Sequence, residues 1–348
     1  MAAVWDFPDF DDHDDVHFFH DRASGLKAII AIHSTALGPA AGGVRFWRYH
    51  DQDAAITDAL RLSRGMSYKN AMAGLPMGGG KGVILADASG AKSPEQIEAF
   101  GRAIESLNGR YVTAEDVGIT EADMARIARQ TRYVSGLPGT AAGCAGGDPG
   151  PFTATGVFLG VKAAWREATG HDNLKGVHVA IQGVGSVGGG LARHLADAGA
   201  VLTIADADEA RAATLAAALG AKYVPAEQIL QAEVDIVSPN ALGAVLNEKS
   251  IAQLRAPVVA GGANNQLATP ADADRLHVRN IVYAPDYVIN AGGIINVALE
   301  YLGRSSDEVT TEINAIPERL AEIWAESRST GLPAAHVADA MAQRLIGR

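Results

Sequence analysis

The chain has 348 residues, with 40 aspartates and glutamates against 29 lysines and arginines, and a formal net charge of -11. At about 150 residues per domain, this length predicts about two domains. The acidic balance argues against a nucleic-acid-binding protein, because the chain lacks a basic stripe that could replace phosphate counterions.

The sequence also indicates where the protein works. Its single cysteine, Cys144, excludes an internal disulfide framework and fits a reducing compartment. No apolar run approaches the roughly 18 residues that a membrane-spanning helix needs. Residues 6–15 are rich in aspartate, the opposite of the basic region that opens a signal peptide. We therefore expect a cytoplasmic protein with no membrane and no nucleic-acid partner.

Short apolar runs alternate with helical patterns in the first half of the chain. Strands are predicted at residues 26–32, 82–86 and 111–114. Apolar residues at helical spacing predict helices at residues 54–65, 94–107 and 120–130. Ser93 is a suitable N-cap for the second of these helices. This alternation predicts a first domain of the α/β class.

The alternation is more regular in the second half, after a Gly- and Pro-rich segment at residues 136–151 that suits a loop or hinge. Strands are predicted at residues 177–182, 201–205, 234–237, 257–260 and 281–284. Helices are predicted at residues 153–169, 187–198, 209–219, 307–328 and 334–345. Strands that alternate with helices imply a parallel, doubly wound sheet.

A glycine-rich turn joins the first strand and helix of that sheet. It has the G-x-G-x-x-G pattern of dinucleotide-binding folds and consists of Gly183, Val184, Gly185, Ser186, Val187 and Gly188. Gly183 allows a tight turn, Gly185 lets a pyrophosphate approach the helix N-terminus, and Gly188 allows close packing. Asp206 ends the next strand, where a carboxylate binds the ribose and repels a 2′-phosphate. The pattern favours NAD, although Arg211 leaves NADP open, and an FAD site or a turn without any cofactor would also fit it.

Two lysines lie near glycines in the first half. Lys69 lies within residues 65–70, and Lys81 follows three glycines and precedes a predicted strand. A lysine that is desolvated, or that neighbours a second ammonium group, has a lowered pKa, as a general base requires. Asp116 follows another short strand and supplies a carboxylate. Two surface lysines and a turn or helix-capping aspartate would be the ordinary explanation of the same residues.

Asparagines, histidines and the single cysteine are further candidates for functional residues. Asn264 and Asn290 follow predicted strands at the carboxyl edge of the sheet, where open α/β folds bind ligands, although turn formation explains them equally well. Three histidines with helical spacing stand among aspartates, namely His13, His17 and His20. They predict a solvated acidic edge rather than a metal site, so no metal is expected. Cys144 has no evident base partner, and we expect no nucleophilic role for it.

Seven segments, taken in order along the chain, carry a resemblance to a known family. They are residues 24–28, 37–45, 66–71, 78–81, 113–118, 263–266 and 283–293. Together they resemble the Glu/Leu/Phe/Val family of amino-acid dehydrogenases, and the leucine dehydrogenases most of all. The resemblance implies reversible oxidative deamination of an L-amino acid to a 2-oxo acid and ammonia, with NAD as the cofactor.

The same resemblance implies roles for individual residues. Lys69 would bind the substrate α-carboxylate, Lys81 would activate water, and Asp116 would move a proton to and from the substrate nitrogen. The remaining implied substrate-binding residues are Ala41, Gly42, Met66, Ala114, Asn264, Ile294 and Val297. Besides the glycine-rich turn and Asp206, the implied cofactor-binding residues are Thr153, Asn240, Ala241, Ala263, Asn264 and Asn290.

The resemblance also bears on the substrate. Ala41 stands where glutamate dehydrogenases carry a lysine, so an acidic side chain would find no partner. Ala114 and Val297 are similar to the leucine-type enzymes and favour branched-chain aliphatic substrates. Ala41 is smaller than the leucine usual there, and one methylene is worth only about 1–3 kcal/mol of discrimination. An aromatic amino acid is therefore the alternative; a hydroxy-acid dehydrogenase and a non-catalytic NAD-binding regulatory protein are more remote.

The expected organisation has an α/β substrate-binding domain at residues 1–145 and a Rossmann-type NAD-binding domain at residues 146–329. Residues 330–348 are expected to pack back on the first domain. A catalytic cleft is expected between the domains, closing about a hinge at residues 143–151. The resemblance implies a homo-oligomer, from dimer to octamer, and the short end after the last predicted helix leaves its size open.

Overall fold

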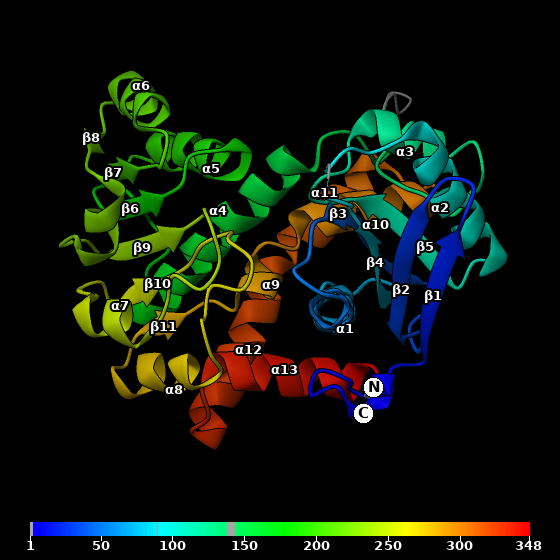
Figure 1. Cartoon of the computed structure of the whole chain (residues 1–348). Helices are drawn as coiled ribbons and strands as arrows, with labels where there is room; N and C mark the ends of the chain where they lie inside the picture. The colour runs from blue at the N-terminus through cyan, green and yellow to red at the C-terminus, as the bar shows by residue number, and fades with distance from the viewer. Residues whose placement is uncertain (1–2, 89, 138–142) are drawn as a thin grey trace. The chain divides into compact units, whose positions relative to one another are not determined.

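The chain divides into two α/β units in the computed structural model, which describes residues 3–88, 90–137 and 143–348 (Figure 1). Unit 1 contains the described residues of Met1–Gly147 together with Ile294–Val309 and Ala342–Arg348, and unit 2 contains Asp148–Gly293 and Thr310–Met341. The predicted two-domain α/β fold is confirmed. None of the described helices has the length and apolar character that a membrane crossing demands.

Unit 1 is built on a mixed sheet with its helices in the intervening segments. The described strands are β1 (Asp15–Asp21), β2 (Leu26–Ser34), β3 (Ala40–Trp47), β4 (Gly78–Leu85) and β5 (Tyr111–Glu115). Their order across the sheet is β1-β2-β4-β3-β5, with β2 antiparallel to β1 and β4, and β3 parallel to β4 and β5. The helices are η1 (Val4–Asp6), α1 (Gln52–Met72), α2 (Pro94–Ser106), α3 (Glu121–Ile127) and α10 (Gly292–Tyr301).

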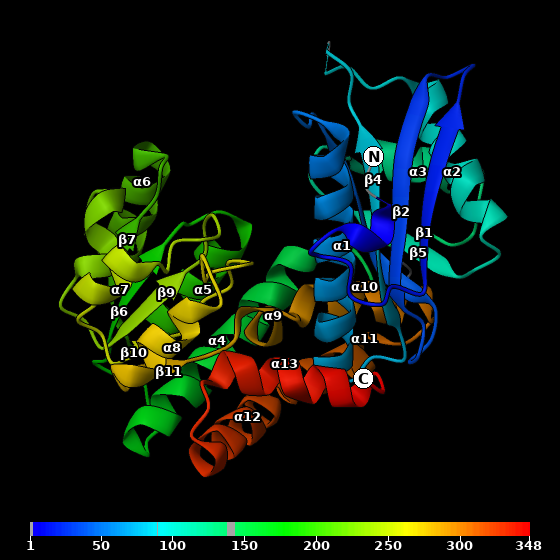
Figure 2. The ribbon, with the colours of Figure 1, turned by 60° about the horizontal axis from the view of Figure 1, so that its bottom comes forward.

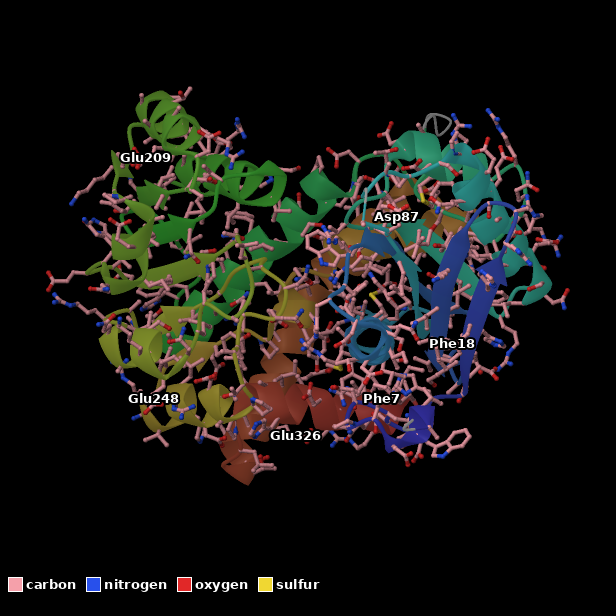
Figure 3. All side chains as sticks on the ribbon, viewed as in Figure 1. Phe7, Phe18, Asp87, Glu209, Glu248 and Glu326 are labelled. Carbon is pink, nitrogen blue, oxygen red and sulfur yellow. The ribbon has the colours of Figure 1, made fainter. Side chains whose placement is uncertain are left out.

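Helices cover both faces of this sheet, as Figure 2 shows for α1 on one side and α2 with α3 on the opposite side. Successive side chains of β2 point to opposite faces. Ile30 therefore joins the core that contains Phe100 of α2, whereas Ile29 joins the core that contains Leu60 of α1. Burial on both faces explains why β2 reads as a nearly continuous apolar run. The edge strand β1 is different, and its Phe18 is 58% exposed (Figure 3).

Unit 2 is a parallel sheet of the doubly wound type. Its described strands are β6 (His178–Gln182), β7 (Val201–Ala205), β8 (Lys222–Tyr223), β9 (Ile236–Pro239), β10 (Val258–Val259) and β11 (Val282–Tyr283). The order β11-β10-β9-β6-β7-β8, with all pairs parallel, is the strand order of dinucleotide-binding folds. Such folds bind ligands where the strand order reverses, which here lies between β6 and β9.

Helices complete the second half of the chain. They are α4 (Pro149–Thr169), α5 (Ser186–Asp197), α6 (Glu209–Leu219), η2 (Ala226–Gln231), α7 (Glu248–Gln253), α8 (Ala271–Val278), α9 (Asp286–Ile289), α11 (Ser306–Asn314), α12 (Ile316–Thr330) and α13 (Ala334–Leu345). The single helix predicted at residues 307–328 is wrong, because the structure divides it at Ala315. Pro317 lies in the first turn of α12, where a missing N–H costs nothing, but it cannot continue a preceding helix.

Three local predictions in unit 1 also differ from the structure. The helix predicted at residues 54–65 continues to Met72, because Gly65 does not adopt a left-handed backbone and packing on the sheet sustains the helix beyond it. The strand predicted at residues 82–86 begins four residues earlier, so Lys81 lies within β4 rather than before it. Strands β1 and β3 were not predicted, because Ala- and Gly-rich or charged sequence carries little strand signal.

The composition of unit 1 differs from the expected division of the chain. Ile294–Val309 groups with this unit rather than with the second domain. Asn296 Oδ1 accepts a hydrogen bond from the Gly146 N–H at 2.8 Å, and the Glu300 carboxylate accepts one from the Gly136 N–H at 3.0 Å. These contacts join residues 150 and 164 positions apart in the sequence, so no local pattern reveals them.

The returning C-terminal segment is also shared between the units. Residues 330–341 group with unit 2, where Tyr287 donates a hydrogen bond to Asp339 at 2.9 Å. The segment that groups with unit 1 begins at Ala342, and there Gln343 donates to the Tyr68 hydroxyl of α1 at 2.9 Å.

The histidines near the N-terminus do not form a helix or a uniformly solvated edge. His17 lies on β1, and His13 is buried with its Nε2 within 2.9 Å of Ser63 Oγ. The ring of His33 lies 4.8 Å from that of His13 and is fully buried. Within the described residues no group of three or more His, Cys, Asp or Glu side chains is arranged to hold a metal.

The buried His33 makes the stability of the protein depend on pH. Burial, followed by the charges of Arg348 and His13, lowers the pKa of His33 from 6.5 to about 4. The folded protein therefore keeps this ring neutral at pH values where the unfolded chain binds a proton. Its stabilising contribution is complete above pH 6.5 and is lost as the pH falls toward 4. The full loss is about 3 kcal/mol, since one pKa unit corresponds to about 1.4 kcal/mol.

Urea denaturation at several pH values between 7 and about 4 measures this loss. We expect His33→Asn to flatten the fall of the urea midpoint with pH in that range. His171→Asn is the matched control, because His171 is exposed and its described hydrogen bonds are made by its backbone. The pH dependence of stability in this variant should match that of the wild type. An unchanged slope in His33→Asn would contradict the assignment.

Candidate active site

The central strand of unit 1 carries a buried lysine. Lys81 lies on β4 between its neighbours β2 and β3, and only 5% of the residue is exposed. Its Nζ donates a hydrogen bond to Asp116 Oδ2 at 2.7 Å. Because Asp116 directly follows β5, the topology of the sheet brings together two residues 35 positions apart. A buried lysine paired with a carboxylate is a candidate acid–base centre.

A second cation, which the sequence analysis missed, contacts the same carboxylate. Arg45 Nε donates to Asp116 Oδ2 at 3.0 Å, and Arg45 Nη1 donates to Asp58 Oδ2 at 2.9 Å. The parallel register of β3 and β5 sets Val44 opposite Glu115. The residues that follow these two, Arg45 and Asp116, therefore come side by side. The sequence signal was weak, since Arg45 lies within a resembling segment but has no distinctive local motif.

The electrostatics of the pair follow from burial and these contacts. Burial lowers the pKa of Lys81 below its ordinary value, while Asp116 opposes that change and Arg45 adds to it. Burial alone would raise the pKa of Asp116, but Lys81 and then Arg45 outweigh it, so the pKa lies below its ordinary value. The site therefore favours an ionised aspartate next to a lysine that gives up its proton more readily than a surface lysine does.

Glycines leave bare backbone around this pair. A Cβ at Gly42 would lie 1.9 Å from the Gly80 carbonyl oxygen and 3.0 Å from Met66 Cγ. A Cβ at Gly43 would lie 2.7 Å from the Glu115 carbonyl oxygen and 2.9 Å from Asp116 Cβ. Only glycine fits these positions without moving backbone, and the close approach sets Met66 directly over β3.

Three more of the predicted substrate-binding residues lie on helix α1 and on strands β3 and β5. Asn70 Nδ2 of α1 donates to the Gly78 carbonyl at 2.6 Å, which ties the helix to the start of β4. Lys69 precedes Asn70 on this helix and is half-buried. Ala41 is 5% exposed on β3, and Ala114 is half-buried on β5, opposite Gly43.

The remaining predicted substrate residues lie on two further segments. Ile294 is half-buried and Val297 is buried, and both lie on α10 within unit 1. Asn264 belongs to unit 2 and is exposed. The described contacts therefore bring together Lys81, Asp116, Gly42, Met66 and the strands that carry Ala41 and Ala114, whereas Asn264 lies in the second unit.

In unit 2 the glycine-rich turn has the shape that a pyrophosphate site requires. Gly183 has a φ of 84°, a backbone conformation that favours glycine. A Cβ at Gly188 would lie 1.9 Å from the carbonyl oxygen of Gly183. Gly185 is the N-cap of α5, no side chain caps the helix there, and a Cβ at Gly185 would have nothing within 4 Å. The helix N-terminus thus offers its N–H groups to an anion.

Asp206 lies next to this turn. Its Oδ2 accepts a hydrogen bond from the Val184 N–H at 2.7 Å, and its Oδ1 accepts from the Asp208 N–H at 2.8 Å and from Arg211 at 2.7 Å. Although burial opposes its charge, the arginine and the backbone donors hold the pKa of this carboxyl below its ordinary value. An ionised carboxylate at this position suits a ribose diol.

Asparagines join the carboxyl ends of three neighbouring strands. Asn240, after β9, accepts a hydrogen bond from the Gly262 N–H at 2.8 Å. Asn290 donates to the Gly262 carbonyl at 3.2 Å and to Asn264 Oδ1 at 2.8 Å. Asn290 Oδ1 is buried with no hydrogen-bond partner. A buried acceptor without a partner is a candidate contact for the carboxamide of a nicotinamide.

Three further predicted cofactor residues surround this network. Ala263 is buried next to Gly262, and Ala241 is exposed next to Asn240. Thr153 lies one turn into α4, where its hydroxyl donates to the Pro149 carbonyl at 2.9 Å. A Cβ at Gly293 would lie 2.6 Å from Thr153 Oγ1, so α4 approaches the segment that follows Asn290.

Comparison with known proteins decides the family. The family model described as Glu/Leu/Phe/Val dehydrogenase, dimerisation domain, matches residues 13–133, and the model described as Glutamate/Leucine/Phenylalanine/Valine dehydrogenase matches residues 204–341. The leucine dehydrogenase of Geobacillus stearothermophilus is 48% identical over 335 residues, which cover 96% of this chain and 91% of that enzyme. The chain belongs to the Glu/Leu/Phe/Val dehydrogenase family. The resemblance inferred from the seven segments is confirmed.

Two further comparisons agree with this family. A valine dehydrogenase of Streptomyces virginiae is 45% identical over 335 residues, covering 95% of this chain and 93% of that enzyme. The structure of the L-tryptophan dehydrogenase from Nostoc punctiforme has a TM-score of 0.86 and 40% identity, covering 96% of each chain. The chain is therefore an amino-acid dehydrogenase with a nucleotide-binding domain, and the prediction of an oxidoreductase is confirmed.

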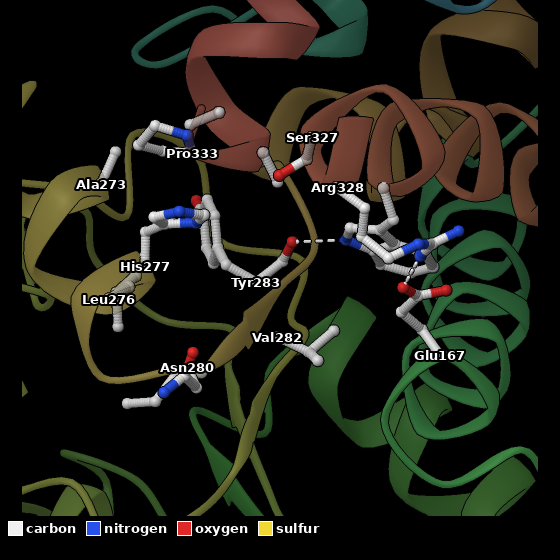
Figure 4. Close-up of a pocket in the computed structure, with 14 residues that line it drawn as sticks. Glu167, Ala273, Leu276, His277, Asn280, Val282, Tyr283, Ser327, Arg328 and Pro333 are labelled. Carbon is white, nitrogen blue, oxygen red and sulfur yellow. Dashed lines mark hydrogen bonds and ion pairs between the residues drawn. The ribbon is translucent and has the colours of Figure 1, made fainter. Parts of the chain in front are cut away.

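A separate cavity of about 220 Å³ lies in unit 2 (Figure 4). Trp324 Nε1 donates to the Tyr283 carbonyl at 2.9 Å beside it, and Arg328 forms an ion pair with Glu167 at one side. None of its lining residues belongs to the predicted site, so we assign it no part in the reaction.

Proposed function

We propose that this dehydrogenase oxidises a branched-chain L-amino acid with NAD and water, releasing a 2-oxo acid, an ammonium ion, NADH and a proton. The observation that carries the proposal is the buried Lys81–Asp116 pair, joined at 2.7 Å and surrounded by bare glycine backbone. It supplies a base and a proton carrier within one small site.

The steps assign one task to each residue. Lys69 binds the α-carboxylate of the substrate. Asp116 takes a proton from the substrate ammonium, so the nitrogen lone pair assists loss of hydride from Cα and an iminium ion forms. Neutral Lys81 takes a proton from water as the oxygen bonds to the iminium carbon. Asp116 returns its proton to the nitrogen and, ionised again, takes the proton of the hydroxyl as the C–N bond breaks, so ammonia leaves as the ketone forms. The protons then held by Asp116 and Lys81 pass to ammonia, which becomes ammonium, and to solvent.

The residues of unit 2 fit the proposed cofactor. When bound, NAD supplies the hydride acceptor at C4 of its nicotinamide. The uncapped N-terminus of α5 would hold its pyrophosphate, and Asp206 would hold its ribose. The asparagines after β9, β10 and β11, with the unpartnered Oδ1 of Asn290, would hold the carboxamide. The expected cleft and hinge closure stay predictions.

The choice of side chain rests on the pocket residues and the relatives. Ala41 offers no charge to an acidic substrate, which argues against glutamate. The leucine and valine dehydrogenases at 44–48% identity support an aliphatic substrate. Because the tryptophan dehydrogenase is 40% identical, the substrate test also includes aromatic amino acids.

Following NADH formation by absorbance, with a panel of leucine, valine, isoleucine, phenylalanine, tryptophan and glutamate, tests the proposal. We expect leucine, valine and isoleucine to give a kcat/KM at least about tenfold above the aromatic substrates, which is about 1.4 kcal/mol of discrimination. We expect glutamate to be inactive.

Each contrary outcome has a definite meaning. A preference for phenylalanine or tryptophan would overturn the aliphatic pocket and leave the chemistry intact. Absence of turnover, in protein shown by calorimetry to bind NADH, would overturn the enzyme proposal and favour a silent NAD-binding protein. Binding of NADPH as tightly as NADH would overturn the cofactor choice, for which Arg211 beside Asp206 leaves room.

A homo-oligomer and a cytoplasmic location belong to the same proposal. The family description of the first matched region as a dimerisation domain supports self-association. The exposed Phe18 on the edge strand β1 gives that region an apolar surface. The single cysteine, Cys144, is free and exposed, as a reducing compartment permits.

A further inference from the structure

A continuous chain of hydrogen bonds leads from the catalytic pair to helix α1. Lys81 Nζ and Arg45 Nε both donate to Asp116 Oδ2, at 2.7 and 3.0 Å. Arg45 Nη1 continues to Asp58 Oδ2 at 2.9 Å, and the Tyr49 hydroxyl donates to the same oxygen at 2.6 Å. Arg45 is thus held between two carboxylates, one next to the reaction and one on α1.

We propose that Arg45 is a positioning residue that keeps Asp116 ionised and oriented while Lys81 is neutral. This inference rests on the proposed function, because it concerns the two residues that move protons in that reaction. Nothing in the family match or in the relatives' names assigns this role to Arg45.

The need for Arg45 arises from a conflict within the catalytic pair. Lys81 must lose its proton before it can take one from water, and Asp116 then loses its nearest cation. A buried carboxylate without a cation tends to become protonated, and the pair would then share one proton instead of performing two separate tasks. Arg45 stays charged throughout, because a guanidinium does not deprotonate in proteins. It therefore allows a neutral lysine and an ionised aspartate to exist together.

The geometry also fixes which oxygen Arg45 engages. Both cations contact Oδ2, so Arg45 continues to hold this oxygen when the hydrogen bond from Lys81 changes. Asp58, itself held by the Tyr49 hydroxyl, fixes the far end of the guanidinium, which limits rotation of Arg45. Rotation of Asp116 is limited in turn, and we assign its proton transfer to the second oxygen, Oδ1.

The charged groups around the pair come from every neighbouring element. Arg45 comes from β3, Asp58 from α1, Lys81 from β4, and the buried Tyr111 from β5. Burial raises the pKa of Tyr111 well above its ordinary value, so its hydroxyl stays neutral in the working range. Replacing Arg45 removes a positive charge from this set and leaves Lys81 and Asp116, the two residues that move protons, in place.

The pH dependence of kcat in Arg45→Gln tests the proposal. In the wild type, kcat for amino-acid oxidation should rise with pH as Lys81 loses its proton. Without the arginine, Lys81 faces the Asp116 charge alone, so we expect the midpoint to move upward by about one pH unit. Arg45→Lys keeps the charge and should return most of that shift, with kcat still reduced because the double anchor is lost.

Controls separate positioning from general damage. Arg102→Gln removes an arginine of the same unit that pairs with Asp21 at 3.4 Å on the surface, and its midpoint should equal that of the wild type. NADH affinity should be unchanged in all three variants. A uniform loss of kcat at every pH, equal in Arg45→Gln and Arg45→Lys, would show a merely structural role and overturn the inference.

A second measurement keeps the inference testable without turnover. The rate of acetylation of Lys81 by acetic anhydride, followed by mass spectrometry across a pH series, reports its pKa directly. We expect a higher pKa in Arg45→Gln than in the wild type. An inactive wild type would defeat the proposed function alone, whereas an unchanged Lys81 pKa in the variant would defeat the role of Arg45 alone.

Discussion

Lys81→Ala is expected to lower kcat for amino-acid oxidation by at least about a thousandfold, within the range that general acid–base groups contribute. The substitution removes the base that takes a proton from water. It also leaves Asp116 with Arg45 but without its partner at 2.7 Å. NADH binding should persist, because the proposed cofactor residues belong to unit 2, while Lys81 belongs to unit 1. Steady-state rates and a fluorescence titration with NADH measure the two effects.

The chain offers a matched control for this substitution. Lys27 is an exposed lysine on β2, the strand next to β4, and Lys27→Ala should retain the wild-type rate and stability. A Lys81→Ala rate within tenfold of the wild type would show that water is activated elsewhere. Loss of NADH binding in the same variant would contradict the assignment of the cofactor site to residues of unit 2 alone.

The catalytic pair illustrates what the sequence reveals about the site. Lys81 and Asp116 stood out because glycines precede the one and a strand precedes the second, and the structure brings them within hydrogen-bonding distance. Arg45 did not stand out, because its importance arises only from the register of β3 and β5, which joins residues 71 positions apart. Local motifs identify groups with special chemistry, but not the partners that a sheet topology supplies.

The fold of unit 2 was more predictable than that of unit 1 for a related reason. Its strands are short parallel runs separated by helices, so most of its elements carry their own pattern, although the short β8, α7 and α8 were not predicted. The order around β6 and β9 follows the common topology. In unit 1, β3 and the first part of β4 are largely alanine and glycine, whose strand propensity is low. These strands form because small residues allow close approach of α1, which is a property of the assembled fold.

Burial of polar residues is a further feature that the sequence concealed. His13 stands among aspartates and His33 follows the apolar run of β2, yet both are buried, and His33 Nδ1 lies within 2.8 Å of Ser67 Oγ. A neutral imidazole can be buried where hydroxyl and backbone partners are available. Those partners come from α1, about 30 to 50 positions away in the sequence, and a pattern of isolated histidines does not predict them.

The close packing of α1 on β4 leads to the strongest stability prediction. Gly79→Ala should prevent folding of unit 1 or lower its thermal midpoint by about 10 °C or more. A Cβ at Gly79 would lie 2.0 Å from the Ser67 nitrogen and 2.3 Å from Ser67 Oγ. Because the first of these is a backbone atom, no rotation of a side chain relieves the clash, and α1 must move away from β4. Overpacking of this kind costs on the order of 3 kcal/mol or more, and in a protein of this size each kcal/mol lowers the midpoint by about 2–4 °C.

Gly65→Ala on the same helix is the matched control for Gly79→Ala. A Cβ at Gly65 would have nothing within 4 Å, and the position is exposed within α1. Alanine is favoured over glycine inside a helix by roughly 0.5–1 kcal/mol, so this variant should be slightly more stable than the wild type. Thermal denaturation of the two variants, followed by circular dichroism, should therefore give shifts of opposite sign. Equal midpoints for Gly79→Ala and the wild type would mean that α1 lies farther from β4 than the structure has it, and the close approach of Ser67 to the catalytic strand would have to be abandoned.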